Sequence, residues 1–230
     1  MGTEVMEMTE NQQRKRLEEA TAALDTVQAE MYALLKSYGF RKHGRLFHRF
    51  VDGDISQVVE IQRGQAYREE THLFWINIGI RVPECVLKSF RPEANAKKYY
   101  HEYQCNMRWT LGEQSKKKNG EYNLRKPLEP MIADIKAKLE TVVVHVFEVL
   151  NSRDAIMAKQ HRYPQFLSSH PLFDCAMICG YRGEIQRAIE LLLDYGCEVE
   201  SDDFPQRYPS AEKDQQACLL ALANRFSIEV

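Results

Sequence analysis

The stretch from Leu34 to Val82 constrains the fold of this chain more than any other. It holds the end of an amphipathic helix and then three segments rich in apolar and aromatic residues: GRLFHRFV, ISQVVEIQR and LFWINIGIRV. Asp52-Gly53 lies between the first two segments. Such a pair favours a tight primed hairpin turn, because both central residues of that turn have positive φ. A helix followed by a hairpin and a third strand predicts an antiparallel sheet with a helix packed on it.

Two long helices are predicted to enclose the strands, over residues 11–38 and 127–151. In both, apolar residues recur at a spacing that forms one helical face. Gly39 follows the first helix and supplies the left-handed conformation that commonly ends one. Pro127 and Pro130 open the second helix, where backbone amides have no helical partner and proline is tolerated.

Strict alternation of apolar and polar residues supports the third strand and identifies a fourth. The segment after Leu73 places Phe74, Ile76 and Ile78 on one face, and a fourth strand is predicted over Tyr103–Leu111. The sequence therefore predicts an α+β fold, in which a four-stranded antiparallel sheet of order 1-2-3-4 packs on the two long helices through the Phe74 face. A C-terminal helical extension follows.

Three regions are predicted along the chain. Residues 1–10 form a disordered N-terminus, residues 11–151 form an α-β-β-β-β-α domain, and residues 152–230 form a helical extension. Within the extension, residues 170–203 are similar to a single ankyrin repeat. Because stable ankyrin arrays need about three stacked repeats, we expect this helical hairpin to dock on the first domain.

The cysteine pattern and the absence of long apolar runs indicate the class of protein. Six cysteines are scattered without a CxxC pair, which favours free thiols in a reducing cytoplasm. Cys175 and Cys179 lie one helical turn apart near His170, but zinc ligands normally form better-matched pairs, so neither a metal nor a cofactor is predicted. No apolar run reaches the roughly 18 residues of a membrane span, and no signal peptide is evident. We therefore expect a cytoplasmic protein.

The charge of the chain is distributed unevenly although its net value is only −2. Residues 1–35 carry 3 Lys and Arg against 7 Asp and Glu, and residues 127–230 carry 10 against 16. Residues 36–126, which contain the predicted strands, carry 18 against 10 and are therefore basic by 8 charges. Two interpretations remain open: the acidic flanks neutralise the sheet region within the molecule, or the sheet region binds an anionic partner.

The face of the sheet opposite the helices is the candidate binding surface. Strand parity places a tryptophan there among amides and an arginine, a composition typical of recognition surfaces. The face comprises Glu60, Gln62, Trp75, Asn77, Asn106 and Arg108, of which Gln62, Trp75, Asn77 and Arg108 are the predicted binding residues. The alternative is that the C-terminal helices cover this face and that its polar groups form a buried network.

The segments GFRKHGRLFHRF, VVEIQRG, FWINIGI and CNMRWTLG together resemble a bacterial family named domain of unknown function 4304. The resemblance covers about residues 15–151. The matching positions are Gly39, Phe40, Phe47, Gln62, Asn77, Gly79, Cys105 and Arg108. The family brings no established reaction, and the resemblance implies a small bacterial binding module of the kind found among immunity proteins of toxin systems.

The sequence favours a non-catalytic module that binds an unidentified protein partner, with neutralisation of a toxin as the specific hypothesis. No GxSxG, HExxH or phosphate-binding glycine motif occurs, so no catalytic residue is predicted. The Lys116–Lys118 run lacks interleaved aromatic residues, which makes a nucleic-acid partner unlikely. The alternative hypothesis is a hydrolase or a nucleic-acid-processing enzyme that uses the basic sheet region.

Overall fold

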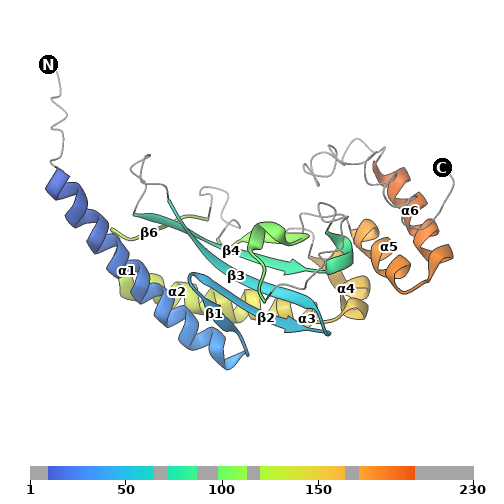
Figure 1. Cartoon of the computed structure of the whole chain (residues 1–230), viewed down its shortest axis with the longest axis horizontal. Helices are drawn as coiled ribbons and strands as arrows, with labels where there is room; N and C mark the ends of the chain where they lie inside the picture. Colours follow the sequence, from blue (N-terminus) through green and yellow to red (C-terminus); the bar gives the residue numbers. More distant parts are fainter. Residues whose placement is uncertain (1–9, 65–71, 87–97, 113–119, 164–170, 200–230) are drawn as a thin grey trace, which may run out of the picture.

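The computed structural model describes residues 10–64, 72–86, 98–112, 120–163 and 171–199, and Figure 1 shows their arrangement. The strands are β1 (Arg41–His43), β2 (Leu46–Val51), β3 (Ile55–Arg63), β4 (Leu73–Arg81), β5 (Met107–Thr110) and β6 (Tyr122–Asn123). The α-helices are α1 (Glu10–Ser37), α2 (Leu128–Lys138), α3 (His145–Val149), α4 (Arg153–Lys159), α5 (Pro171–Tyr181) and α6 (Ile185–Val199). A π-helical turn, η5 (Leu139–Val144), joins α2 to α3, and short 3-10 turns occur at η2 (Pro83–Cys85), η4 (Glu102–Gln104) and η6 (Gln160–Arg162). In these ranges every helix is too short or too polar to span a membrane.

The strands form one antiparallel sheet in the order β1-β2-β3-β4-β5, with β6 paired to the start of β4. The α+β class is confirmed, and the four predicted strands, which correspond to β2 to β5, lie in the predicted order. The sheet has six strands where four were predicted. The two additional strands are short: β1 is the exposed segment Arg41–His43, and β6 has two residues. Neither carries the apolar alternation that identifies a strand in a sequence.

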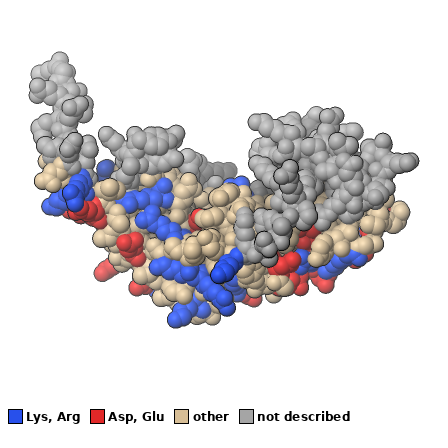
Figure 2. Space-filling view, viewed as in Figure 1, with Lys and Arg blue, Asp and Glu red and all other residues tan. Residues whose placement is uncertain are grey.

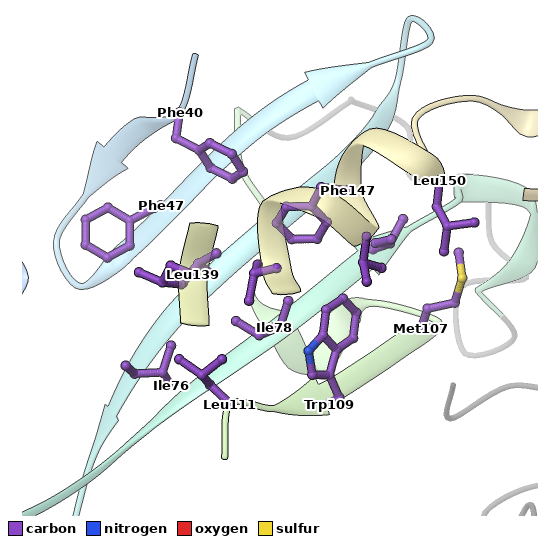
Figure 3. Packing of buried hydrophobic residues seen from close by; sticks show 14 of the residues in the cluster. Phe40, Phe47, Ile76, Ile78, Met107, Trp109, Leu111, Leu139, Phe147 and Leu150 are labelled. Carbon is purple, nitrogen blue, oxygen red and sulfur yellow. The ribbon is translucent and has the colours of Figure 1, made fainter. Parts of the chain in front are cut away.

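One face of the sheet, which we call the inner face, packs against α1 and against the α2–η5–α3 helix. Phe74, Ile76 and Ile78 are fully buried there, as predicted, together with Phe147 of α3. Figure 3 shows Phe147 and Leu139 lying over Ile78 and Ile76. Burial of these side chains, at about 1.5–3 kcal/mol each, provides the main stabilisation of the layer.

Two predicted turns form at glycine residues with positive φ. The Gly39 amide donates to the Lys36 carbonyl at 3.1 Å and the Phe40 amide donates to the Leu35 carbonyl at 3.2 Å, the pattern of a Schellman motif. In the β2–β3 hairpin, Asp52 and Gly53 have φ values of 46° and 84°, the signs that a primed turn needs. The hairpin loop contains three residues rather than two, because Val51 pairs with Ile55.

The prediction of a strand over Tyr103–Leu111 is wrong in its first half. The strand begins only at Met107, and the preceding residues form η4, which crosses the outer face of the sheet. Tyr103 is 66% exposed, and Cys105 is buried against Gly79 of β4. The apolar alternation of this segment therefore does not reflect a strand: Cys105 fits where glycine lacks a side chain, and Tyr103 lies at the surface.

The helices α4 to α6 lie at the end of the sheet where β4 finishes (Figure 1). Phe173, Met177 and Tyr195 belong to the same apolar cluster as the inner face. A domain boundary near residue 151 stays a prediction. Of the N-terminal residues 1–10 that were expected to be disordered, residues 1–9 lie outside the described residues, and Glu10 is the first residue of α1. Residues 200–230 of the predicted helical extension also lie outside them.

Arg153 at the start of α4 connects these helices to the sheet through ion pairs. Its guanidinium donates to the fully buried Glu84 carboxylate at 2.6 Å and 3.0 Å, and to Asp54 at 2.7 Å. It also donates to the Asp52 carbonyl in the hairpin loop at 3.1 Å. The hydrogen bond to Glu84 raises the pKa of Arg153 above its ordinary value. One cation thus joins α4, the β2–β3 loop and η2.

Gly79→Ala should destabilise the protein by about 1–3 kcal/mol, because the new Cβ would lie 2.5 Å from Cys105 Sγ and 2.8 Å from its Cβ. Gly79 does not have a positive φ, so the expected cost is steric rather than conformational. Urea unfolding of Gly79→Ala, Cys105→Gly and the double variant forms a double-mutant cycle. We expect Cys105→Gly to recover most of the loss, and strictly additive effects would contradict the close approach.

Arg153→Met should cost about 3–5 kcal/mol of unfolding free energy, because the buried Glu84 carboxylate would lose its counter-charge. The double variant Arg153→Met, Glu84→Met should be markedly more stable than the single one. Lys138→Met serves as the control, since its pair with Asp134 is exposed on both sides and should contribute less than about 1 kcal/mol. An Arg153→Met effect as small as the control would show that the cluster does not hold α4 in place.

Candidate functional site

The outer face of the sheet, opposite the long helices, is divided into a covered part and an open part. The segment 98–106 covers the middle of the face, where Tyr99 and Cys105 pack on Leu46 and Val58. Toward the end where β4 begins, the face carries Gln62, Trp75, Asn77 and Thr110, which we call the amide patch. Gln62 is exposed, and the other three side chains are partly exposed.

Hydrogen bonds within the amide patch orient its side chains. Gln62 lies opposite Trp75 in the β3–β4 ladder, and Asn77 lies opposite Thr110 in the β4–β5 ladder. Asn77 Nδ2 donates to Gln62 Oε1 at 2.8 Å, and Thr110 Oγ1 donates to Asn77 Oδ1 at 3.1 Å. These bonds use both amide oxygens as acceptors. Within the described ranges the Nε2 group of Gln62 has no partner and remains available to a ligand.

Arg108 lies outside the amide patch, although it was predicted with the other three residues. It pairs with Gly79 in the β4–β5 ladder, and its Nε donates to Glu102 Oε1 at 2.5 Å. Glu102 belongs to the segment that crosses the face and is nearly buried. The structure thus brings Gln62, Trp75 and Asn77 together, whereas Arg108 holds the crossing segment in place.

The other two residues predicted on this face also bind within the protein. Glu60 accepts hydrogen bonds from the His101 ring Nδ1 at 2.7 Å and from the Glu102 amide at 2.9 Å. Asn106 is buried: its Oδ1 accepts from the Val82 amide at 2.8 Å, and its Nδ2 donates to Asp174 of α5 at 3.2 Å. Asn106 is therefore part of the contact with α5 and not of the open surface.

The described part of the C-terminal extension does not cover the amide patch. Trp75 lies near the start of β4, at the end of the sheet where β6 pairs. In Figure 1, α5 and α6 lie at the opposite end, beyond the last residues of β4. Over residues 152–163 and 171–199, the alternative in which C-terminal helices bury Trp75 is therefore not realised.

A group of stacked rings on the outer face was not predicted from the sequence. The Tyr99 cluster, as we call it, comprises His43, His48, Tyr99, His101 and Tyr103. His43 stacks on Tyr99 with centroids 3.9 Å apart, and His101 stacks on Tyr103 at 5.4 Å. Tyr99 also contacts the rings of His48 and His101. The run YYHEY at 99–103 is the signal that could have indicated an aromatic surface.

The described thiols are poorly suited to nucleophilic catalysis. Cys85, Cys105, Cys175 and Cys179 are unpaired and buried. Burial is the main cause that raises the pKa of each, to about 11 for Cys175. A thiol reacts as its thiolate, so these groups are largely unreactive near neutral pH. Of the residues described, no three His, Cys, Asp or Glu side chains are placed to hold a metal ion, and His170 lies outside them.

Comparison with known proteins supports the family resemblance. The model of the family described as Domain of unknown function (DUF4304) matches residues 31–149, which is 119 of the 230 residues. The match begins within α1 and ends at the last residue of α3, so it contains the whole sheet, whereas α4 to α6 lie beyond it. No curated protein and no solved structure matches the chain.

The burial of His48 generates a prediction on pH dependence. Burial lowers the pKa of His48, and the nearby charges of Arg41 and His43 lower it further. The unfolded chain therefore binds this proton more readily, so stability should be intact above the ordinary histidine pKa of about 6.5 and decrease below it. We expect urea unfolding of His48→Gln to depend less on pH than that of the wild type, between about pH 7.5 and about pH 5.5. His145→Gln, an exposed position on α3, is the control. An equal pH dependence in all three proteins would contradict the prediction.

Proposed function

Because this chain belongs to the family described as Domain of unknown function (DUF4304), whose description names no activity, we propose a function from the geometry of its own side chains. The protein is a non-catalytic module that binds a protein partner through the open part of its outer sheet face. The amide patch is the proposed contact site, with Trp75 as its apolar anchor.

The observation that carries this proposal is the partly exposed Trp75 beside amides that are already oriented. A tryptophan provides a large contact area, and its loss from the centre of an interface commonly costs about 2 kcal/mol or more of binding free energy. The bonds from Asn77 to Gln62 and from Thr110 to Asn77 hold the neighbouring polar groups in one arrangement. Less side-chain entropy is then lost when a partner binds.

Two further observations favour binding over catalysis. The four described thiols are buried and have raised pKa values. Glu60 accepts a hydrogen bond from His101, an arrangement that also orients general bases in enzymes, but the His101 ring is stacked on Tyr103 and the nearby Cys105 thiol is buried beside Gly79. A hydrolase or nucleic-acid-processing enzyme that uses this region is the competing proposal, and a hydrolytic activity of the purified protein that His101→Gln abolishes would favour it.

We propose that this binding neutralises a toxin and that the protein acts in the cytoplasm of a bacterium. This step rests on the family resemblance alone. Genomic context tests it directly. A neighbouring reading frame for a toxin supports an immunity role, whereas a metabolic operon favours an enzyme.

Trp75→Ala should reduce partner binding by about 2 kcal/mol or more, roughly 30-fold, with little change in the thermal midpoint. The partner is first captured from the source organism with the wild-type protein and purified, and its affinity for each variant is then measured by calorimetry. Leu193→Ala is the control, because Leu193 is 66% exposed on α6 and far from the patch. A loss of about 3–5 kcal/mol of stability in Trp75→Ala, the size expected of a core tryptophan, would refute the proposed site.

A further inference from the structure

We propose that the Tyr99 cluster and the basic β1–β2 hairpin beside it form a second contact surface on the same face, which binds an acidic, partly apolar segment of a polypeptide. The inference rests on the proposed function, because it specifies the chemistry of the partner. It adds a site that is separate from the amide patch.

The Tyr99 cluster and the neighbouring Phe50 provide aromatic area that is exposed and held in place. Tyr103 is 66% exposed, and Phe50, whose ring contacts His48 at 5.9 Å, is 41% exposed. Between them, the stacks of His43 on Tyr99 and of His101 on Tyr103 restrain the rings. Exposed aromatic side chains with restricted motion are typical anchors of protein interfaces, because they provide area at low entropic cost.

Basic side chains surround the Tyr99 cluster. Arg41, Lys42 and Lys98 are exposed and Arg45 is partly exposed. Within the described part of the chain none of these four side chains has an ion pair, whereas Glu60 and Glu102 are bound by His101 and Arg108. Figure 2 shows Lys and Arg side chains gathered over this part of the molecule, with acidic groups mainly toward its margins. The surface around the rings is therefore positive and complements carboxylates.

Cationic surfaces with aromatic rings also bind single-stranded nucleic acids, so the charges beside the rings decide between a nucleic acid and a polypeptide. Glu60 and Glu102 lie beside the rings, and a backbone that carries a phosphate at every unit cannot avoid placing some of its charges against them, whereas a polypeptide can space its carboxylates apart. A peptide can place its carboxylates against Arg41 and Lys98 and its apolar side chains against Tyr103 and Phe50. Exposed aromatic rings flanked by separate cations thus favour a polypeptide that carries both apolar and acidic side chains.

The two surfaces share no residue but lie next to each other along β3. Glu60, which holds His101 of the Tyr99 cluster, is two residues from Gln62 of the amide patch, and both side chains lie on the outer face. A partner that contacts Trp75 can therefore extend past Glu60 and His101 and place its acidic side chains beside the β1–β2 hairpin. Electrostatic contacts of this kind mainly raise the association rate and make it depend on salt.

The test uses the full-length protein and a fluorescein-labelled peptide in which pairs of Glu alternate with Phe and Leu. Its counterpart has Gln in place of each Glu, and a labelled oligothymidylate of matched length represents nucleic acid. Fluorescence anisotropy gives the affinities. We expect the wild type to bind the Glu peptide about tenfold or more tightly than the Gln peptide, and more tightly than the oligonucleotide.

The variant Arg41→Glu, Lys98→Glu should weaken binding of the Glu peptide by about tenfold or more. The control Lys15→Glu, Arg16→Glu changes the net charge equally on exposed positions of α1 and should have less than about a threefold effect. Tyr103→Ala, at an exposed ring, should also weaken binding, and it serves if the double variant does not fold. Thermal melts monitor folding in each case.

Three outcomes would overturn the inference: no binding of the Glu peptide by the wild type, tighter binding of the oligonucleotide, or equal losses in the double variant and in the α1 control. Trp75→Ala separates this inference from the proposed function. If the purified partner depends on Trp75 but not on Arg41, Lys98 or Tyr103, the function stands and the second surface is refuted. If only the second surface matters, the amide patch is refuted as the contact site.

Discussion

The arrangement of the outer sheet face depends on the missing side chain of Gly79. Its absence lets Cys105 approach the backbone of β4, so that the segment 98–106 can cross the sheet instead of extending β5. Glu60 and Arg108 then bind this segment through His101 and Glu102. Without that close approach, the segment 98–106 could not lie against the sheet. The stacked rings around Tyr99, which this segment carries, would then lose their place beside the amide patch.

At the other end of the sheet, the polar contacts fix how the helices pack on the strands. Arg153, Glu84 and Asp174 are all buried where α4 and α5 meet the end of β4. Burying charge is costly unless each group is paired, so such contacts define one arrangement of the helices more than they add stability. The family match ends at residue 149, so Arg153 and the helices that it holds lie outside the matched residues.

Most of the candidate site could be predicted because strand parity alone places alternate residues on one face. Gln62, Trp75 and Asn77 lie on β3 and β4, two long strands with buried opposite faces, so a shift in register would expose their isoleucines. Arg108 was placed on the correct face as well. Its partner Glu102 could not be predicted, because a hydrogen bond between side chains on a crossing segment and a strand leaves no periodic signal in the sequence.

The sequence by itself determined the two helices, the order of the long strands, the Gly39 helix end and the inner face. These features follow from local backbone preferences and from apolar periodicity, which act over a few residues. Only the tertiary structure decided the path of Tyr103–Asn106 and the positions of α5 and α6. Both depend on contacts between segments far apart in the chain. The space beside Gly79 and the apolar surface at the end of the sheet select one conformation among those that the local sequence allows.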